Sequence, residues 1–169
     1  MNKFDFNNRT AVITGGGQGF GLDIAKRFLN SGAKVIIWDI DEELLNSAVK
    51  EVNHSNLSYN LIDVSNYSQI EKTVSDITSQ NKIDILINNA GITGPTAPLW
   101  EYDVEMWNKI VQINLVGTFN CCRAIVPSMI KNNYVRRNYF KPFINSITIA
   151  NIFFYIYYIY FLISFGNEL

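Results

Sequence analysis

The chain has 169 residues, of which 48% are hydrophobic, and its 14 basic and 15 acidic side chains give a formal net charge of −1. This length suits a single domain, and the balanced charge excludes the strongly basic face that nucleic-acid-binding proteins present. The two cysteines, Cys121 and Cys122, are adjacent and too few for a metal cage, so we predict no metal site, no disulfide framework and a cytoplasmic protein.

Short β-branched runs alternate with amphipathic segments over most of the chain. Apolar side chains recur at helical spacing in the longer segments, as expected for helices that cover a sheet. We predict strands at 9–14, 34–39, 57–62 and 83–88. Helices are predicted at 21–30, after Asp41 with an apolar stripe from Leu44 to Val52, from a start between Ser65 and Ser68 with Ile70, Val74 and Ile77 on one face, and from Asp103 to about Ile130. This alternation predicts right-handed crossovers and a parallel sheet covered on both faces, which is an α/β fold of the Rossmann-type, doubly wound form.

Particular residues mark the ends of these helices. Gly32 follows the first helix, where a left-handed cap is commonly needed. Asp41 can cap the second helix, and Ser68 with Glu71 has the spacing of a capping box for the third. The long fourth helix is expected to kink or break near Pro127. Its predicted inward-facing residues are Trp107, Ile110, Val111, Leu115, Phe119, Ala124 and Ile125.

The octapeptide TGGGQGFG joins the first strand to the first helix and supplies the candidate residues Thr14, Gly15, Gly19, Phe20 and Gly21. Glycines permit positive φ and let the backbone approach a pyrophosphate, while the free N–H groups of a helix start favour anions. The alternative is a tight turn with no ligand. A mononucleotide P-loop is excluded, because no Lys-Ser or Lys-Thr follows Gly21.

Asp39 ends the second strand, 18 residues after Gly21. A carboxylate at this point can accept hydrogen bonds from both adenosine ribose hydroxyls and repels a 2′-phosphate. Its neighbours Trp38 and Ile40 offer no basic partner for such a phosphate, so we predict NAD in preference to NADP. Asp39 could instead cap the following helix, but Asp41 is better placed for that.

Two further short motifs follow the third and fourth predicted strands, namely Asp63-Val64 and Asn88-Asn89-Ala90-Gly91. With these and the glycine pattern, the chain from about Phe4 to Asn133 resembles the short-chain dehydrogenase/reductase family, and within it the 3-oxoacyl-acyl-carrier-protein reductases and sugar dehydrogenases. The resemblance implies an NAD(H)-dependent oxidoreductase acting on a hydroxyl or keto group, with a homo-oligomer through the long helix. The matching motifs are Thr14, Gly15, Gly19 and Gly21 of the glycine pattern, Asp63 and Val64 at the adenine ring, and Asn88, Asn89, Ala90 and Gly91 bordering the cofactor.

Asn114 lies on the apolar stripe of the long helix, where asparagine has poor helix propensity and needs hydrogen-bond partners if buried. One interpretation is a satisfied structural asparagine that links helix to sheet. The family resemblance implies a catalytic role instead, in which Asn114 holds a water that relays protons to a catalytic lysine.

The acid/base pair that this family uses is absent from the sequence. Hydride transfer at an alcohol carbon needs a general acid or base at the oxygen, and the resemblance implies a Tyr-x-x-x-Lys pair with an upstream serine. None of the nine tyrosines is followed four residues later by lysine, and no lysine occurs after Lys141. We therefore expect a truncated, catalytically impaired form that keeps the cofactor-binding half, and whether it is an enzyme stays open.

Composition changes near Asn133, which divides an NAD-binding domain (1–133) from an apolar, aromatic-rich tail (134–169). Of 23 aromatic residues, 12 lie in the 36 residues from Tyr134 onward. The tail fits three hypotheses: an arbitrary continuation after a frameshift or truncation, a membrane anchor at 147–165, or a strand that covers the edge of the fourth strand. The alternative to an impaired oxidoreductase is accordingly a non-catalytic NAD-binding or regulatory module, with or without a membrane anchor.

Overall fold

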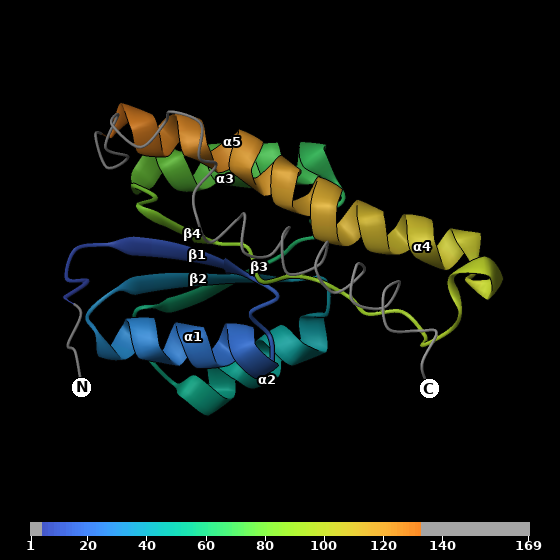
Figure 1. Cartoon of the computed structure of the whole chain (residues 1–169). Helices are drawn as coiled ribbons and strands as arrows, with labels where there is room; N and C mark the ends of the chain where they lie inside the picture. The colour runs from blue at the N-terminus through green and yellow to red at the C-terminus, as the bar shows by residue number, and fades with distance from the viewer. Residues whose placement is uncertain (1–4, 133–169) are drawn as a thin grey trace.

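The computed structural model describes residues 5–132 of the chain (Figure 1). Within them, four parallel strands form one sheet in the order β3-β2-β1-β4. Their bounds are β1 (Thr10–Thr14), β2 (Lys34–Asp39), β3 (Leu57–Leu61) and β4 (Ile85–Ile87). Every predicted strand is present, and the predicted parallel sheet is confirmed.

Helices cover both faces of this sheet, as Figure 1 shows. The helices α1 (Gly19–Asn30) and α2 (Glu42–Val52) lie on one face, and α3 (Tyr67–Gln80) and α5 (Gly117–Lys131) lie on the other. Alternate residues of β1 serve the two cores, because successive strand side chains point to opposite faces. Ile13 packs towards α1 and α2, whereas Val12 packs towards α3 and α5. The doubly wound arrangement is therefore confirmed.

The helix ends follow the sequence with one exception. Asp41 caps α2 by accepting hydrogen bonds from the N–H groups of Glu43 and Leu44, and Gly32 has a φ of +90° after α1. The capping box predicted at Ser68 is wrong, because Asn66 caps α3 and accepts a bond from the N–H of Gln69. Asparagine caps a helix as well as serine does. The sequence therefore offers two adequate caps, Asn66 and Ser68, and residue type alone does not decide between them.

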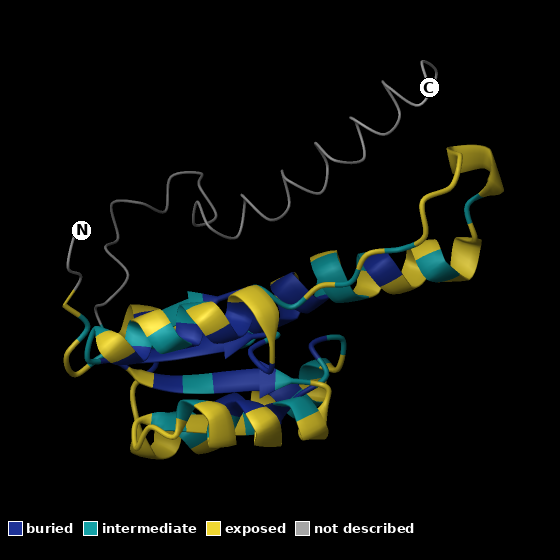
Figure 2. Ribbon diagram, turned by 90° about the horizontal axis from the view of Figure 1, so that it is seen from below, coloured by how far each residue is buried: buried dark blue, intermediate teal, exposed yellow. Residues whose placement is uncertain are grey.

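The long fourth helix is continuous from Val104 to Lys131 and comprises α4 (Val104–Val111), a π-helical turn (Gln112–Val116) and α5. A short 3₁₀ helix, η1 (Leu99–Glu101), precedes it. Figure 2 shows α4 projecting past the sheet with little buried surface. The helix runs through Pro127, so it is not interrupted there, and the irregular turn lies at residues 112–116.

The inward face of this helix also differs from the prediction. Trp107, Leu115 and Phe119 are 37%, 46% and 58% exposed. Ile110 and Ile125 are buried as predicted, and Val111 and Ala124 are half-buried. The other buried residues of α5 are Gly117, Thr118, Asn120, Cys121 and Met129. By length and composition, this is the one helix in residues 5–132 that is apolar enough to span a membrane, a test that core helices of globular proteins also meet. Since α5 packs against α3 and β4, its apolar residues have a place in the core.

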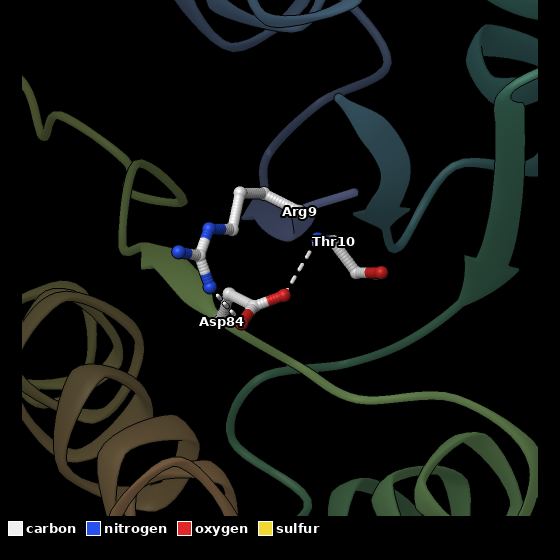
Figure 3. A network of polar contacts seen from close by, with 3 residues as sticks. All are labelled: Arg9, Thr10 and Asp84. Atoms are coloured by element: carbon white, nitrogen blue, oxygen red, sulfur yellow. Dashed lines mark hydrogen bonds and ion pairs between the residues drawn. The ribbon is translucent and has the colours of Figure 1, made fainter. Parts of the chain in front are cut away.

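A buried carboxylate closes the sheet at the end away from the glycine loop (Figure 3). Asp84, which is 4% exposed, accepts hydrogen bonds from the Arg9 guanidinium at 3.1 Å and from the Thr10 N–H at 3.0 Å. It thus joins the start of β1 to the start of β4.

Cys121 lies in the core, as predicted for a reduced cysteine that fills space there. Burial raises the pKa of its thiol to about 12, and the neighbouring Cys122 adds to the shift. The predictions for the tail, including the 134–169 division and the span at 147–165, lie outside the described residues.

Candidate functional site

A cleft of the described domain lies at the carboxyl ends of β1, β2 and β4, where ligands bind in open α/β sheets. Its volume is about 450 Å³, within the range of small-molecule sites. It is lined by Gly15, Gln18, Phe20, Trp38, Asp39, Ile40, Asp41, Leu44, Ile62, Asp63, Val64, Asn89, Ala90, Gly91, Ile92 and Ile113. Eight of the eleven cofactor-binding residues predicted from the sequence are in this set; the other three, Thr14, Gly19 and Gly21, are not among the lining residues.

The glycines of the loop are required by close contacts and by backbone shape. Gly15 and Gly19 have φ values of +63° and +55°, which residues other than glycine adopt only at a cost in conformational energy. A Cβ on Gly21 would collide with the Gly15 carbonyl oxygen and lie 2.6 Å from the Asn89 amide nitrogen. The loop therefore packs directly on the start of α1 and leaves an open backbone surface beside the cleft.

The start of α1 has no side-chain cap. Gln18 occupies the N-cap position without a capping hydrogen bond, and the first turn contains no acidic residue. The first N–H groups of a helix have no intrahelical acceptor, and they favour anions. Together with the missing Cβ atoms of the loop, this uncapped end is a surface that a pyrophosphate fits. Phe20, in the same turn, is 84% exposed at the rim of the cleft.

Thr14 and Asn89 join the glycine loop to the segment after β4. The Thr14 hydroxyl accepts hydrogen bonds from the N–H groups of Asn89 and Ala90, both at 3.0 Å, and donates to the Ile87 carbonyl at 3.4 Å. The Asn89 side-chain amide donates to the carbonyls of Thr14 and Gly15, both at 3.0 Å. These bonds fix the wall of the cleft formed by Asn89, Ala90 and Gly91.

On the opposite side, Asp39 ends β2 and lines the cleft. Its Oδ2 accepts a hydrogen bond from the Gly17 N–H at 3.0 Å, and its Oδ1 accepts one from the Asp41 N–H at 3.3 Å. Asp41 itself caps α2, as expected, so the two carboxylates have different contacts.

Asp63 and Val64 form the third side of the cleft, after β3. Asp63 Oδ1 accepts bonds from the Ser65 N–H and hydroxyl at 2.8 and 2.7 Å. Behind them, a Cβ on Gly117 would lie 2.7 Å from Val64 Cγ2, and the Asn120 amide donates to the Val64 carbonyl at 3.1 Å. Gly117 and Asn120 thus support the site from α5, a role that an apolar-periodicity argument does not detect.

Asn114 lies in the π-helical turn and pairs with a single residue of the cleft wall. Its Oδ1 accepts the Ile92 N–H and its Nδ2 donates to the Ile92 carbonyl, both at 2.9 Å. The side chain therefore has the partners expected of a structural asparagine, and it links the helix to the segment after β4. The π turn permits this contact, since such turns displace a residue from the regular helical ladder.

The charges around the cleft are all of one sign. Three carboxylates, those of Asp39, Asp41 and Asp63, are among the lining residues, and no lysine or arginine is. An anionic ligand group would therefore be held by backbone N–H groups at the glycine loop. Within residues 5–132, no group of three histidine, cysteine or acidic side chains is placed to hold a metal ion.

The fold and this cleft define a Rossmann-type α/β domain with a nucleotide-sized cleft at the carboxyl ends of its strands. The sequence pattern of the short chain dehydrogenase family matches residues 9–136. This chain belongs to that family, and its nicotinamide cofactor fits a site with an open glycine loop and an uncapped helix start. The resemblance inferred from the motifs is confirmed.

Several relatives show what the chain is similar to. It is 36% identical over 132 residues to a 2-dehydro-3-deoxy-L-rhamnonate dehydrogenase (NAD(+)) of Sphingomonas sp., covering 78% of this chain and 52% of that protein. It is 37% identical over 128 residues to a 3-oxoacyl-acyl-carrier-protein reductase of Chlamydia trachomatis, covering 73% and 51%. A 3-ketoacyl-(acyl-carrier-protein) reductase from Brucella melitensis, crystallised with NADH, superposes with a TM-score of 0.71 at 32% identity, covering 76% and 53%. The chain thus spans about half the length of these relatives.

Sequence reasoning missed other residues of the site. Gly16 and Gly17 fall on the variable positions of the family glycine pattern, yet a Cβ on Gly16 would lie 2.6 Å from Ile37 Cβ. The run of three glycines was the available signal. Ile92 and Ile113 line the cleft beside predicted residues, and nothing in their residue type distinguishes them from core isoleucines.

Proposed function

We propose that residues 5–132 bind NAD(H), with the adenosine half in the cleft just described. Asp39 would hold the ribose hydroxyls, Asp63 and Val64 the adenine, and the glycine loop with the start of α1 the pyrophosphate. When bound, the nicotinamide supplies or accepts the hydride in this family's chemistry. Asn89, Ala90 and Gly91 would border the nicotinamide half of the cofactor.

The observation that carries the preference for NAD is the charge of the lining. Three carboxylates and no lysine or arginine line the cleft that would have to hold an NADP 2′-phosphate. Like charges brought together without a cation cost several kcal/mol, and each 1.4 kcal/mol is a factor of about ten in affinity. The carboxylate at Asp39 adds the acceptor that free ribose hydroxyls need.

We further propose that these 169 residues do not transfer hydride unaided. The relatives are oxidoreductases, and acting on a hydroxyl or keto group is the chemistry that their names suggest for a complete protein of this kind. The sequence nevertheless contains no tyrosine followed four residues later by lysine. Loss of a general acid alone lowers a rate by about 10²- to 10⁴-fold. Asn114 would then have a structural role, holding the cleft wall through its contact with Ile92. The protein as a whole would be a cytoplasmic NAD-binding chain.

Titration of the purified full chain with NADH, followed by nicotinamide fluorescence, tests this proposal. We expect saturable NADH binding, NADPH binding about 100-fold weaker, and no NADH oxidation with short 3-keto substrates. Equal affinity for NADH and NADPH would contradict the preference for NAD. Substrate-dependent oxidation of NADH would contradict the proposed lack of turnover, with a complete family member run alongside to show that the assay works.

The exposed apolar row on the long helix supports a second proposal, self-association. Trp107, Leu115 and Phe119 lie partly exposed on one helix that also projects past the sheet. A second copy of the chain would cover this row and remove its apolar surface from water. Sedimentation velocity should therefore show a dimer or larger species, and Phe119→Glu should shift it towards the monomer, whereas a Glu71→Gln control on α3 should not. Identical sedimentation of wild type and Phe119→Glu would exclude this interface.

A further inference from the structure

Asp39 makes a contact that ribose recognition does not require. The loop between β1 and α1 is tied to the end of β2 by two neighbouring hydrogen bonds. The Gly16 N–H donates to the Trp38 carbonyl at 3.0 Å, and the Gly17 N–H donates to Asp39 Oδ2 at 3.0 Å. The second bond uses a side chain, so its strength depends on which residue occupies position 39.

Gly17 is shaped for this contact. A Cβ on Gly17 would lie 2.9 Å from Asp39 Oδ2 and 2.9 Å from Leu44 Cβ, so any larger residue would push the carboxylate away. Its φ lies outside the left-handed region, so glycine is needed here for space. The pairing is also partly shielded, since Gly17 is buried and Asp39 is half-buried. A charge-assisted bond to a shielded backbone N–H is about twice as strong as a neutral one.

We propose that Asp39 is a positioning residue for the glycine loop and fixes its shape before any ligand arrives. The Gly17 bond holds the turn that leads into Gln18 and the uncapped start of α1. Asn89 holds the other side of the same loop through the Thr14 and Gly15 carbonyls. The loop is thus fixed from β2 and from the segment after β4. This inference rests on the proposed function for its consequence, that the loop so fixed receives the pyrophosphate.

Two effects of Asp39 on a phosphate then oppose each other. Its hydrogen bond preorganises the loop and strengthens phosphate binding, whereas its negative charge near the loop weakens it. An asparagine at position 39 separates them, because its amide oxygen can still accept the Gly17 N–H without the charge. With that oxygen turned to Gly17, the asparagine NH₂ group faces the Asp41 N–H and cannot accept it, so the bond from Asp41 is lost in asparagine as it is in alanine. Alanine also lacks the charge, and it alone lacks the bond from Gly17. The difference between Asp39→Asn and Asp39→Ala therefore isolates the bond to the loop.

Amide hydrogen exchange of the ligand-free chain, measured by NMR, tests the contact directly. We expect Asp39→Ala to speed exchange of the Gly17 N–H by about 10-fold or more, with Asp39→Asn close to wild type. The Val12 N–H in the middle of β1 reports on global unfolding and should change far less than Gly17. Asp41→Asn, which removes a neighbouring carboxylate but keeps a side-chain oxygen to cap α2, should leave Gly17 exchange unchanged. Unchanged Gly17 exchange in Asp39→Ala would overturn the inference.

Binding of 2′,3′-dideoxy-ADP, which has the pyrophosphate but neither ribose hydroxyl, tests the consequence. Because Asp39 cannot contact hydroxyls that are absent, any loss in Asp39→Ala relative to Asp39→Asn comes from the loop. We expect Asp39→Ala to bind this ligand about 5-fold more weakly than Asp39→Asn. Equal affinities would overturn the link between Asp39 and phosphate binding. Failure of the wild-type chain to bind ADP would instead refute the proposed function, and Gly17 exchange would still decide whether Asp39 fixes the loop.

Discussion

Replacing Gly21 by alanine is expected to abolish NADH binding at concentrations that saturate the wild-type chain. The added Cβ would collide with the Gly15 carbonyl oxygen and press on the Asn89 amide, which is 2.6 Å away. Either α1 or the loop must then move, and both belong to the proposed pyrophosphate site. Overpacking of this kind also lowers the free energy of unfolding, here by about 2–3 kcal/mol. Fluorescence titration and urea unfolding measure the two effects.

Gly19→Ala is the matched control for that substitution. No atom lies within 4 Å of a Cβ built on Gly19, although its φ of +55° makes the alanine strained. Strain without a clash should cost only about 1–2 kcal/mol in the free energy of unfolding. Wild-type NADH affinity in Gly21→Ala would mean that the contact between the loop and α1 does not shape the binding site.

Thr14→Val should give the second large effect, because the hydroxyl of Thr14 makes three hydrogen bonds in a side chain that is 1% exposed. Valine keeps the shape but leaves the N–H groups of Asn89 and Ala90 without their acceptor. Each buried group left unsatisfied costs about 1–3 kcal/mol, so we expect the free energy of unfolding to fall by about 2–4 kcal/mol. The wall of the cleft should loosen as well, weakening NADH binding.

Thr14→Ser keeps the hydroxyl and removes only a methyl group, so it should cost about 1 kcal/mol. Urea unfolding of both variants distinguishes loss of the hydrogen bonds from loss of packing. If Thr14→Val were as stable as Thr14→Ser, the hydroxyl would not be what holds the segment after β4.

The strands and the cleft could be predicted because their signals are local. KVIIWD forms β2 at the predicted residues, Lys34–Asp39, and the β-branched run before the glycines forms β1. Asp39, Asp63 and Asn89 then meet at one end of the sheet because parallel strands place their carboxyl ends together. The family match over 9–136 follows from the same motifs.

The orientation of the long helix could not be predicted, because its sequence is apolar on more than one side. Trp107, Leu115 and Phe119 follow one row of helical positions, and Ile110, Cys121 and Ile125 follow another; only the second is buried. The side of the helix that is buried is decided by the fit of small and polar residues against the segment after β3. Gly117 leaves room for Val64, and the Asn120 amide donates to the Val64 carbonyl. Hydrophobicity alone therefore predicts that both rows face inward, whereas only the row with Ile110 and Ile125 is buried.

The contacts of Asn114 and Gly17 also depend on tertiary structure. Asn114 was recognised as a polar residue on an apolar stripe, but the residue that satisfies it, Ile92, lies 22 positions away. Gly17 meets Asp39 across the same number of residues. Such pairs form only once the sheet brings the ends of its strands together, and no spacing rule identifies them in advance.

Titration of the ¹⁵N-labelled full chain with NAD, followed by two-dimensional NMR, tests the central claim most directly, because it reports binding residue by residue. The account predicts saturable shifts at Gly15 to Gly21, around Asp39, at Asp63 and Val64, and at Asn89 to Gly91. The amides of Thr10 and Asp84, at the opposite end of the sheet, should stay unchanged (Figure 3). No saturable shift of the loop glycines up to about 5 mM NAD, or shifts centred at the Asp84 end, would contradict it.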